Sequence, residues 1–168
     1  MKKLIILGAG GLGRTVADVA RQLGYEKIGF LDDGNPNTMG KCDEFLQFLD
    51  GNTEIYPAFG DNAARLGWLD RLENEGAVVP TLIHPGAYVS PTAIVDMGAV
   101  ILPGALIGTD CHVGRGVIVN MGAIVDHGCV LENGVHLAPG AIVKAENRIP
   151  AGTKVDSGEV IANGTYPL

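Results

Sequence analysis

The sequence predicts an α/β + β architecture, with a small α/β domain over residues 1–84 and a parallel β-helix over residues 85–168. Three observations support this order. A glycine-rich turn follows a short apolar run near the N-terminus, an aliphatic residue recurs at every sixth position from Val89 onward, and glycine recurs at one place within those hexads. Neither a helix nor an alternating strand has a period of six, whereas solenoids are built from short repeats of fixed length.

The glycine-rich turn predicts a nucleotide site. Leu4–Leu7 is a strand candidate that runs into the turn, and a helical pattern follows it as far as Leu23. A second strand candidate, Lys27–Leu31, ends in two aspartates. This order matches the nucleotide-binding fingerprint, in which N–H groups at the helix start bind phosphate and an acidic residue binds ribose. We therefore expect substrate binding by Gly8, Gly10, Gly11, Gly13, Arg14, Asp32 and Asp33.

The length of this domain limits its ligand. A full dinucleotide fold needs two such halves in roughly 150 residues, and only about half that length precedes the hexads. The domain is therefore half-Rossmann-like and fits a nucleotide sugar better than NAD. The alternative is a turn that only packs a helix against a strand. Further expected elements are a short helix, a strand, a helix with an Asp61 cap and a last strand, over residues 43–49, 54–59, 61–75 and 77–83.

The hexads predict a three-sided prism. Thirteen consecutive hexads begin with an aliphatic residue, from Val89 to Ile161, and the fourth position is glycine in ten of them. Glycine suits a corner because it adopts positive φ without steric cost. Three hexads then form one coil, and coils stack at about 4.8 Å. The small fifth position also points inward, so Cys111 and Cys129 share one interior column and are expected to pack rather than react.

Composition excludes several classes of partner. The net charge is −7 without a cluster of Lys or Arg, so we expect neither nucleic acid nor an anionic membrane as a partner. Three cysteines without zinc-type spacing indicate a reducing, cytoplasmic protein, and no segment reaches transmembrane length. No two of the four histidines are five residues apart, the spacing of the zinc-binding enzymes on this fold, so no metal site is expected.

The combined motifs resemble a known family. The hexads resemble the left-handed β-helix of the hexapeptide acyltransferases. The N-terminal motifs are similar to those of the sialic acid O-acetyltransferases and the UDP-4-amino-4,6-dideoxy sugar N-acetyltransferases. The resemblance implies a left-handed prism, acetyl-CoA as co-substrate, a nucleotide sugar as acceptor and a homotrimer with acyl-CoA between neighbouring prisms. It covers nearly the whole chain and depends on Gly8–Arg14, Phe30–Asp33, Gly60–Asn62 with Arg65, and Thr81–Pro85.

The resemblance also assigns the catalytic residues. It implies that His127, near a corner of the prism and accessible to solvent, is the general base, and that Asn120 and His136 line the same pocket. A neutral imidazole can accept a proton at pH 7. His136 lies half a coil further on, so it would approach His127 of a neighbouring subunit rather than its own. From spacing alone, His127 is equally an exposed corner residue without a role.

Two features depart from the family pattern. The sugar N-acetyltransferases have a glutamate after the catalytic histidine that orients it, whereas Gly128 follows here. Asp126 precedes His127, but alternation along an extended strand predicts that its side chain points elsewhere. The subgroup also continues for another coil or more after the position of His136, near the CoA site.

Three functions are therefore expected in order. The first is acetyl-CoA-dependent N-acetylation of a UDP-linked amino-deoxy sugar by direct transfer, with His127 as base. The second is O-acetylation of a sialic acid or another glycan by the same base. The third is a β-helix trimer that binds a nucleotide without catalysis, which the absence of the glutamate favours.

Overall fold

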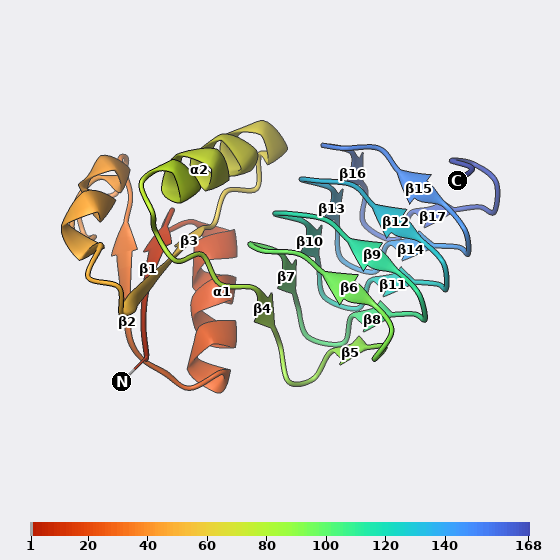
Figure 1. Ribbon diagram of the computed structural model, residues 1–168, viewed down its shortest axis with the longest axis horizontal. Coiled ribbons are helices and arrows are strands. Elements are labelled where there is room, and N and C mark those ends of the chain that lie inside the picture. Colours follow the sequence, from red (N-terminus) through yellow and green to blue (C-terminus); the bar gives the residue numbers. More distant parts are fainter. Residues whose placement is uncertain (1) are drawn as a thin grey trace. The chain divides into compact units, whose positions relative to one another are not determined.

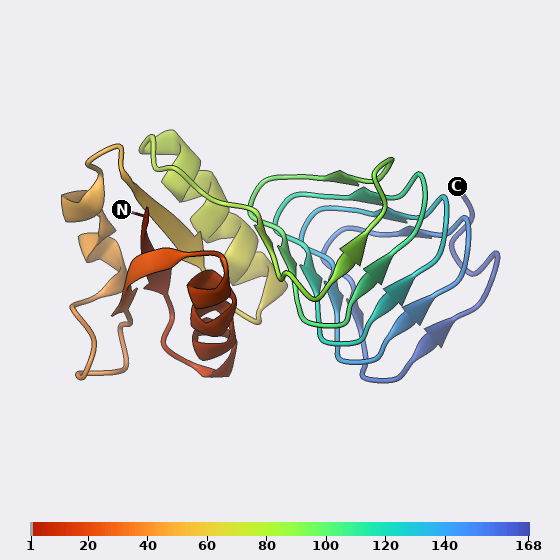
Figure 2. The ribbon, with the colours of Figure 1, turned by 90° about the horizontal axis from the view of Figure 1, so that it is seen from below.

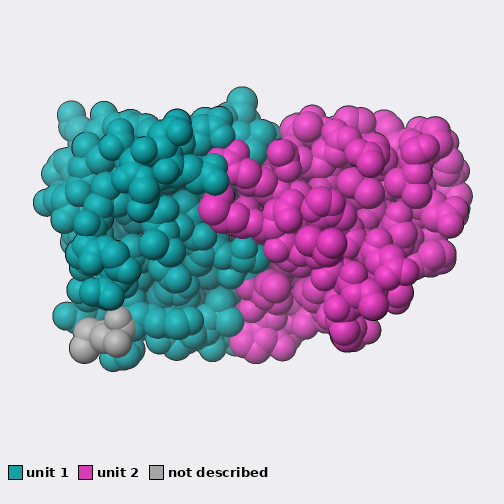
Figure 3. Space-filling view, in the orientation of Figure 1, with its two compact units in different colours: residues 1–82 teal, residues 83–168 magenta. Residues whose placement is uncertain are grey.

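The computed structural model describes residues 2–168, which form two compact units (Figures 1 and 3). The first unit extends to Leu82 and the second comprises Ile83–Leu168. Within residues 2–168, no helix combines the length and apolar character needed to cross a membrane. The predicted order of an α/β domain followed by a parallel β-helix is confirmed.

The first unit is built on a three-stranded parallel sheet of order β2-β1-β3. The central strand is buried from Leu4 to Leu7, which explains its continuous run of aliphatic residues. Helices follow or precede each strand, and Asp61 caps the last helix by accepting a hydrogen bond from Ala64 N at 2.8 Å. The elements are β1 (Lys2–Leu7), α1 (Gly11–Gln22), β2 (Tyr25–Leu31), the 3₁₀ helix η1 (Cys42–Phe48), β3 (Thr53–Pro57) and α2 (Asn62–Asn74).

One predicted element is wrong. The strand expected over residues 77–83 is reduced to a single bridge between Val78 and Glu54, followed by the two-residue strand β4 (Leu82–Ile83). Pro80 lies between them, and proline has no N–H to donate to a ladder. β4 belongs to a sheet of the β-helix rather than to the sheet of the first unit.

The second unit winds two-residue strands into stacked coils (Figure 2). Strands three hexads apart pair in parallel, as Ile124 with Ile142 and His112 with Val130, so each coil contains three hexads as predicted. The three sheets have the orders β16-β13-β10-β7-β4, β17-β14-β11-β8-β5 and β15-β12-β9-β6. Their strands are β5 (Tyr88–Val89), β6 (Ile94–Val95), β7 (Val100–Ile101), β8 (Leu106–Ile107), β9 (His112–Val113), β10 (Ile118–Val119), β11 (Ile124–Val125), β12 (Val130–Leu131), β13 (His136–Leu137), β14 (Ile142–Val143), β15 (Arg148–Ile149), β16 (Lys154–Val155) and β17 (Val160–Ile161).

The second residue of each strand fills the interior of the prism. These are the aliphatic residues of the hexads, and they form one core with the small residues of the fifth position. The glycines of the fourth position have φ between 65° and 72°. Two residues other than glycine also adopt positive φ, Asp110 at 56° and Glu146 at 57°. They lie one coil before and one coil after Gly128, so both are on the corner next to His127.

A buried amide ties the end of the chain to this core. Asn147 is fully buried, and its Nδ2 donates to Lys144 O at 2.8 Å and to Ala162 O at 3.0 Å. Its Oδ1 accepts a hydrogen bond from Tyr166 N at 2.8 Å. A buried polar group with all these partners costs little to desolvate, and it holds the segment after β17 against the last coil.

Close packing between α1 and the glycine turn leads to a stability prediction. A Cβ atom added to Gly13 would lie 2.0 Å from Gly8 O, whereas one added to Gly11 would meet nothing within 4 Å. We expect Gly13→Ala to destabilise the first unit by about 1–3 kcal/mol, because the backbone must move apart. Gly11→Ala is the matched control and should leave the thermal midpoint unchanged or slightly higher. Equal midpoints for the two variants in circular dichroism melts would contradict this interpretation.

Candidate functional site

The glycine turn lies at the carboxyl end of β1, between the ends of its two neighbours. Gly8 N donates to Leu31 O at 2.8 Å, and Ala58 N donates to Leu7 O at 2.8 Å. Gly8 has φ +97°, and a Cβ on it would lie 3.1 Å from Ala58 O, so glycine is required there. No side chain caps α1 at Gly10. The N–H groups of its first turn are therefore available to an anion, at the edge where open α/β sheets bind ligands.

Asp32 connects this turn to the loop after β2. Its Oδ2 accepts a hydrogen bond from Ala9 N at 2.7 Å and its Oδ1 accepts one from Gly34 N at 2.8 Å. These two bonds, that of Ala9 first, lower the pKa of Asp32 below its ordinary value, so the carboxylate is ionised at neutral pH. Each oxygen keeps a second lone pair that can accept a hydrogen bond from a ribose hydroxyl.

The second aspartate has a different contact. Asp33 Oδ1 accepts a hydrogen bond from Cys42 N at 2.8 Å and so holds the start of η1. Both aspartates line a cavity of about 280 Å³, together with Thr38 and Lys41. Arg14 is exposed beside the turn, and its Nη1 donates to Ala9 O at 3.1 Å. The residues predicted to bind substrate thus surround one turn, although the aspartates also organise its backbone.

A buried arginine shapes the third loop at this edge. Arg65 is fully buried, and its guanidinium donates to Phe59 O at 2.8 Å and to Asn62 Oδ1 at 2.8 Å. The Phe59 ring stacks on Trp68 with centroids 6.0 Å apart. Arg65 therefore holds the loop that follows β3, and burial lowers the pKa of its guanidinium.

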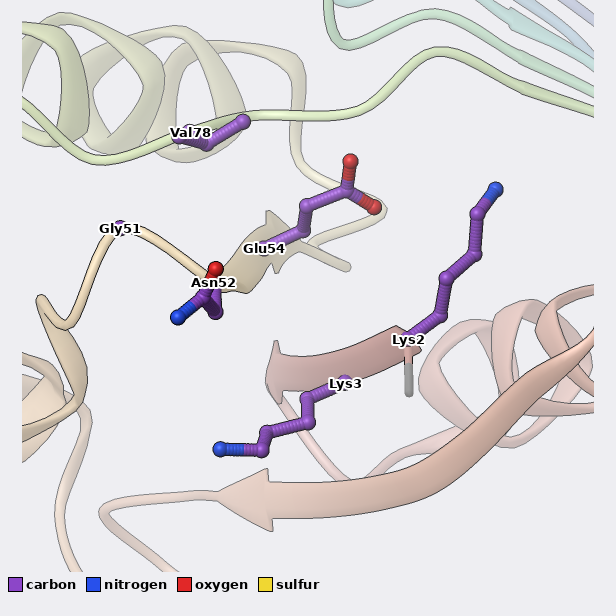
Figure 4. Close-up of a pocket in the computed structure, with 6 residues that line it drawn as sticks. All are labelled: Lys2, Lys3, Gly51, Asn52, Glu54 and Val78. Carbon is purple, nitrogen blue, oxygen red and sulfur yellow. The ribbon is translucent and has the colours of Figure 1, made fainter.

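Another pocket lies at the opposite end of the sheet. Its volume is about 580 Å³, and it is lined by Lys2, Lys3 and Glu54 at the amino ends of β1 and β3 (Figure 4). Figure 4 shows the two lysines extending in different directions. Tyr25 donates a hydrogen bond to the Glu54 carboxylate, and Lys3 Nζ lies 3.3 Å from Asp50 Oδ2. Its charges are paired within the protein, and it lies away from the glycine turn.

In the second unit, His127 lies at the corner after β11 and pairs with Asp126. The side chain of His127 is 62% exposed, and its Nδ1 lies 2.9 Å from Asp126 Oδ1. The same oxygen accepts a hydrogen bond from the backbone N–H of His127 at 2.7 Å. The expectation that Asp126 points elsewhere is therefore wrong. Alternation applies to an extended strand, whereas the chain turns the corner here and brings both side chains to one side.

The backbone around this pair is held by both neighbouring coils. Gly128 N donates to Thr109 O at 2.9 Å, and Glu146 N donates to His127 O at 3.1 Å. A Cβ on Gly108 would lie 2.9 Å from His127 N, so only glycine allows this approach. Gly108 was not predicted from the sequence. Its position three hexads before Asp126, directly beneath it in the stack, was the available signal.

Asn120 and His136 lie together on a different sheet. Asn120 follows β10 and His136 begins β13, and these strands are neighbours in one sheet, whereas β11 belongs to another. Asn120 Nδ2 lies 3.5 Å from His136 Nε2. Within one chain the structure thus brings together two of the three predicted catalytic residues and separates them from His127.

The interior cysteines have structural contacts. Cys111 and Cys129 are both buried in the core of the prism, and their thiols donate to Asp126 O at 2.9 Å and to Lys144 O at 3.2 Å. The Cys111 thiol and burial together raise the pKa of Cys129, which disfavours a reactive thiolate. Among residues 2–168, no three metal-ligating side chains lie close enough to hold an ion.

Comparisons with known proteins identify relatives of both units. Residues 3–72 match the family model of the PglD N-terminal domain. The acetyltransferase domain of PglB from Neisseria gonorrhoeae, solved in complex with acetyl coenzyme A, is 37% identical with a TM-score of 0.89, over 95% of this chain and 81% of that chain. PerB from Caulobacter crescentus, solved with CoA and GDP-perosamine, is 25% identical with a TM-score of 0.86, over 96% of this chain and 89% of that chain.

A more distant structure shares the fold. WeeI from Acinetobacter baumannii is 21% identical with a TM-score of 0.86, over 98% of this chain and 82% of that chain. The similarity to the PglB domain covers both units, and it confirms the resemblance that the hexads and the glycine turn predicted. The chain belongs to the PglD-type hexapeptide-repeat acetyltransferases.

Proposed function

We propose that this protein transfers acetyl from acetyl-CoA to the amine of a UDP-linked amino-deoxy sugar, with His127 as general base. Membership of the family makes it an acetyl-CoA-dependent sugar N-acetyltransferase. The observation that carries the proposal is the 37% identity, over 95% of the chain, to an acetyltransferase domain bound to acetyl coenzyme A. UDP as the nucleotide rests on the resemblance to the UDP-4-amino sugar enzymes.

The proposed reaction is a direct transfer. The sugar amine attacks the thioester carbonyl carbon, and His127 Nε2 takes the proton that the nitrogen loses as the C–N bond forms. The tetrahedral intermediate then breaks its C–S bond, and the CoA thiolate leaves and accepts that proton. Asn120 or His136 would stabilise the oxyanion by donating a hydrogen bond. The exposure of the His127 side chain lets both substrates reach it.

The first unit would hold the nucleotide. The uncapped start of α1 suits a diphosphate, and Asp32 suits a ribose hydroxyl. The proposed contacts are Gly8, Gly10, Gly11, Gly13, Arg14, Asp32 and Asp33. The three cysteines are free and buried, which supports the proposed cytoplasmic location.

An apolar outer face supports a homotrimer. The outward residues of the sheet β17-β14-β11-β8-β5 are all apolar or aromatic, and Tyr88, Leu106 and Val160 are 56%, 43% and 49% exposed. Contiguous exposed apolar patches mark interaction surfaces. A trimer would also bring His127 of one subunit toward the Asn120–His136 pair of the next, which completes a site that one chain holds in two parts.

The role of His127 predicts a large loss on its removal. We expect His127→Ala to lower kcat by about 10²–10⁴-fold, the usual contribution of a general base. The assay is thiol release from acetyl-CoA in the presence of the amino sugar. His112→Ala is the matched control, because His112 is also an exposed histidine of the prism but pairs with Asp96. Equal turnover by His127→Ala and wild type would refute the base assignment.

The acceptor class predicts an order of substrates. A UDP-4-amino-4,6-dideoxy sugar should react with kcat/KM at least about tenfold above its GDP counterpart and above sialic acid. The same thiol-release assay compares them at equal concentration. Faster turnover of sialic acid would indicate an O-acetyltransferase. Absence of CoA binding at millimolar ligand in calorimetry would instead indicate a non-catalytic nucleotide-binding trimer.

The outer face predicts a change in assembly. Leu106→Glu should shift the protein from trimer to monomer in sedimentation velocity, because it buries a charge in the proposed interface. Turnover should fall with the trimer population. Lys154→Glu, on the polar outer column of another sheet, is the control and should leave the trimer intact. A monomeric wild type at micromolar concentration would disprove the assembly.

A further inference from the structure

We infer that Asp126 is a positioning residue for His127, replacing the glutamate that follows the catalytic histidine in related enzymes. This inference rests on the proposed function, in which His127 is the base. Gly128 occupies the position after His127 and has no side chain to orient the ring. Asp126, on the other side, lies within hydrogen-bond distance of it.

The contact selects one tautomer of His127. An ionised carboxylate has only acceptors, so Nδ1 at 2.9 Å from Asp126 Oδ1 carries the hydrogen. The neutral ring then has its lone pair on Nε2, the atom that must take a proton from the acceptor amine. As the ring becomes positively charged in the reaction, the adjacent carboxylate stabilises it.

The carboxylate is itself held in place. Asp126 Oδ1 accepts the backbone N–H of His127 at 2.7 Å, so one oxygen bonds both the backbone and the ring of the same residue. Asp126 N donates to Val143 O at 2.9 Å in the next coil. The backbone bonds at Gly128 and at His127 O, and the absence of a side chain at Gly108, complete a corner with little freedom.

The exposure of the pair separates orientation from stability. The side chains of His127 and Asp126 are 62% and 53% exposed, and an exposed ion pair adds little to folding free energy. Removal of the carboxylate should therefore affect catalysis far more than folding. This difference makes the role testable with variants that remain folded.

Glu146 provides a matched control. It is acidic and lies on the same corner one coil further on, where its Cγ is 3.4 Å from the position of a Cβ on Gly128. Its backbone N–H bonds His127 O, but within residues 2–168 its carboxylate accepts no hydrogen bond. Glu146→Gln removes the same charge from the same corner without removing a partner of the imidazole.

The experiment compares Asp126→Asn, Asp126→Ala, Glu146→Gln and His127→Ala in the full-length protein. Thiol release from acetyl-CoA with the UDP-amino sugar is measured as kcat/KM from pH 5.5 to 9, and thermal midpoints check folding. We expect both Asp126 variants to lose about tenfold or more in kcat at pH 8, where the base is neutral. Their acid limb should move to lower pH, because a carboxylate favours a protonated neighbour. Glu146→Gln should stay within about twofold of wild type in kcat, with an unmoved acid limb.

The outcomes separate the two assignments. If His127→Ala is inactive while the Asp126 variants match Glu146→Gln in rate and pH profile, the positioning role is wrong and the base assignment stands. Wild-type turnover by His127→Ala would overturn the base assignment and the role of Asp126 with it. Loss of kcat and a moved acid limb in both Asp126 variants, at unchanged thermal midpoints, would support the inference.

Discussion

The second unit depends on one constraint, the pairing of each residue with its equivalent three hexads further along the chain. Ile124 N donates to Ala141 O and Val130 N donates to Asn147 O, and the same offset recurs on all three sheets. This register decides which side chains form each column. Because it does not change along the prism, interior positions, outer faces and corners keep their composition from coil to coil.

The two candidate sites share a physical device. In each, an aspartate accepts a hydrogen bond from a backbone N–H of the segment that would contact substrate: Asp32 from Ala9 N at 2.7 Å and Asp126 from His127 N at 2.7 Å. These bonds lower the pKa of both carboxylates. Each aspartate therefore stays charged at neutral pH while it holds a local backbone, and it keeps lone pairs for a second partner. Short segments are thus fixed without burial.

Sequence patterns predicted the parts of the molecule that repeat or that follow a known fingerprint. The hexads located the strands, the core and the glycine corners, because side chains in a stacked register obey one rule. The prediction failed where that rule ends. Asp126 lies at a corner where alternation no longer holds, and Pro80 breaks the strand expected up to Ile83. Gly108 is essential through a contact across coils, which neighbours in the sequence do not reveal.

The register also limits how such a protein can change in evolution. One inserted residue would shift every later side chain between the inside, the outside and the corners, and would separate Asp126 from the glycine beneath it. An insertion or deletion of three whole hexads would add or remove one complete turn of the prism and leave the pairing rule intact. Genes for this architecture should therefore gain and lose length in steps of whole coils, while substitutions accumulate freely only on the outer faces.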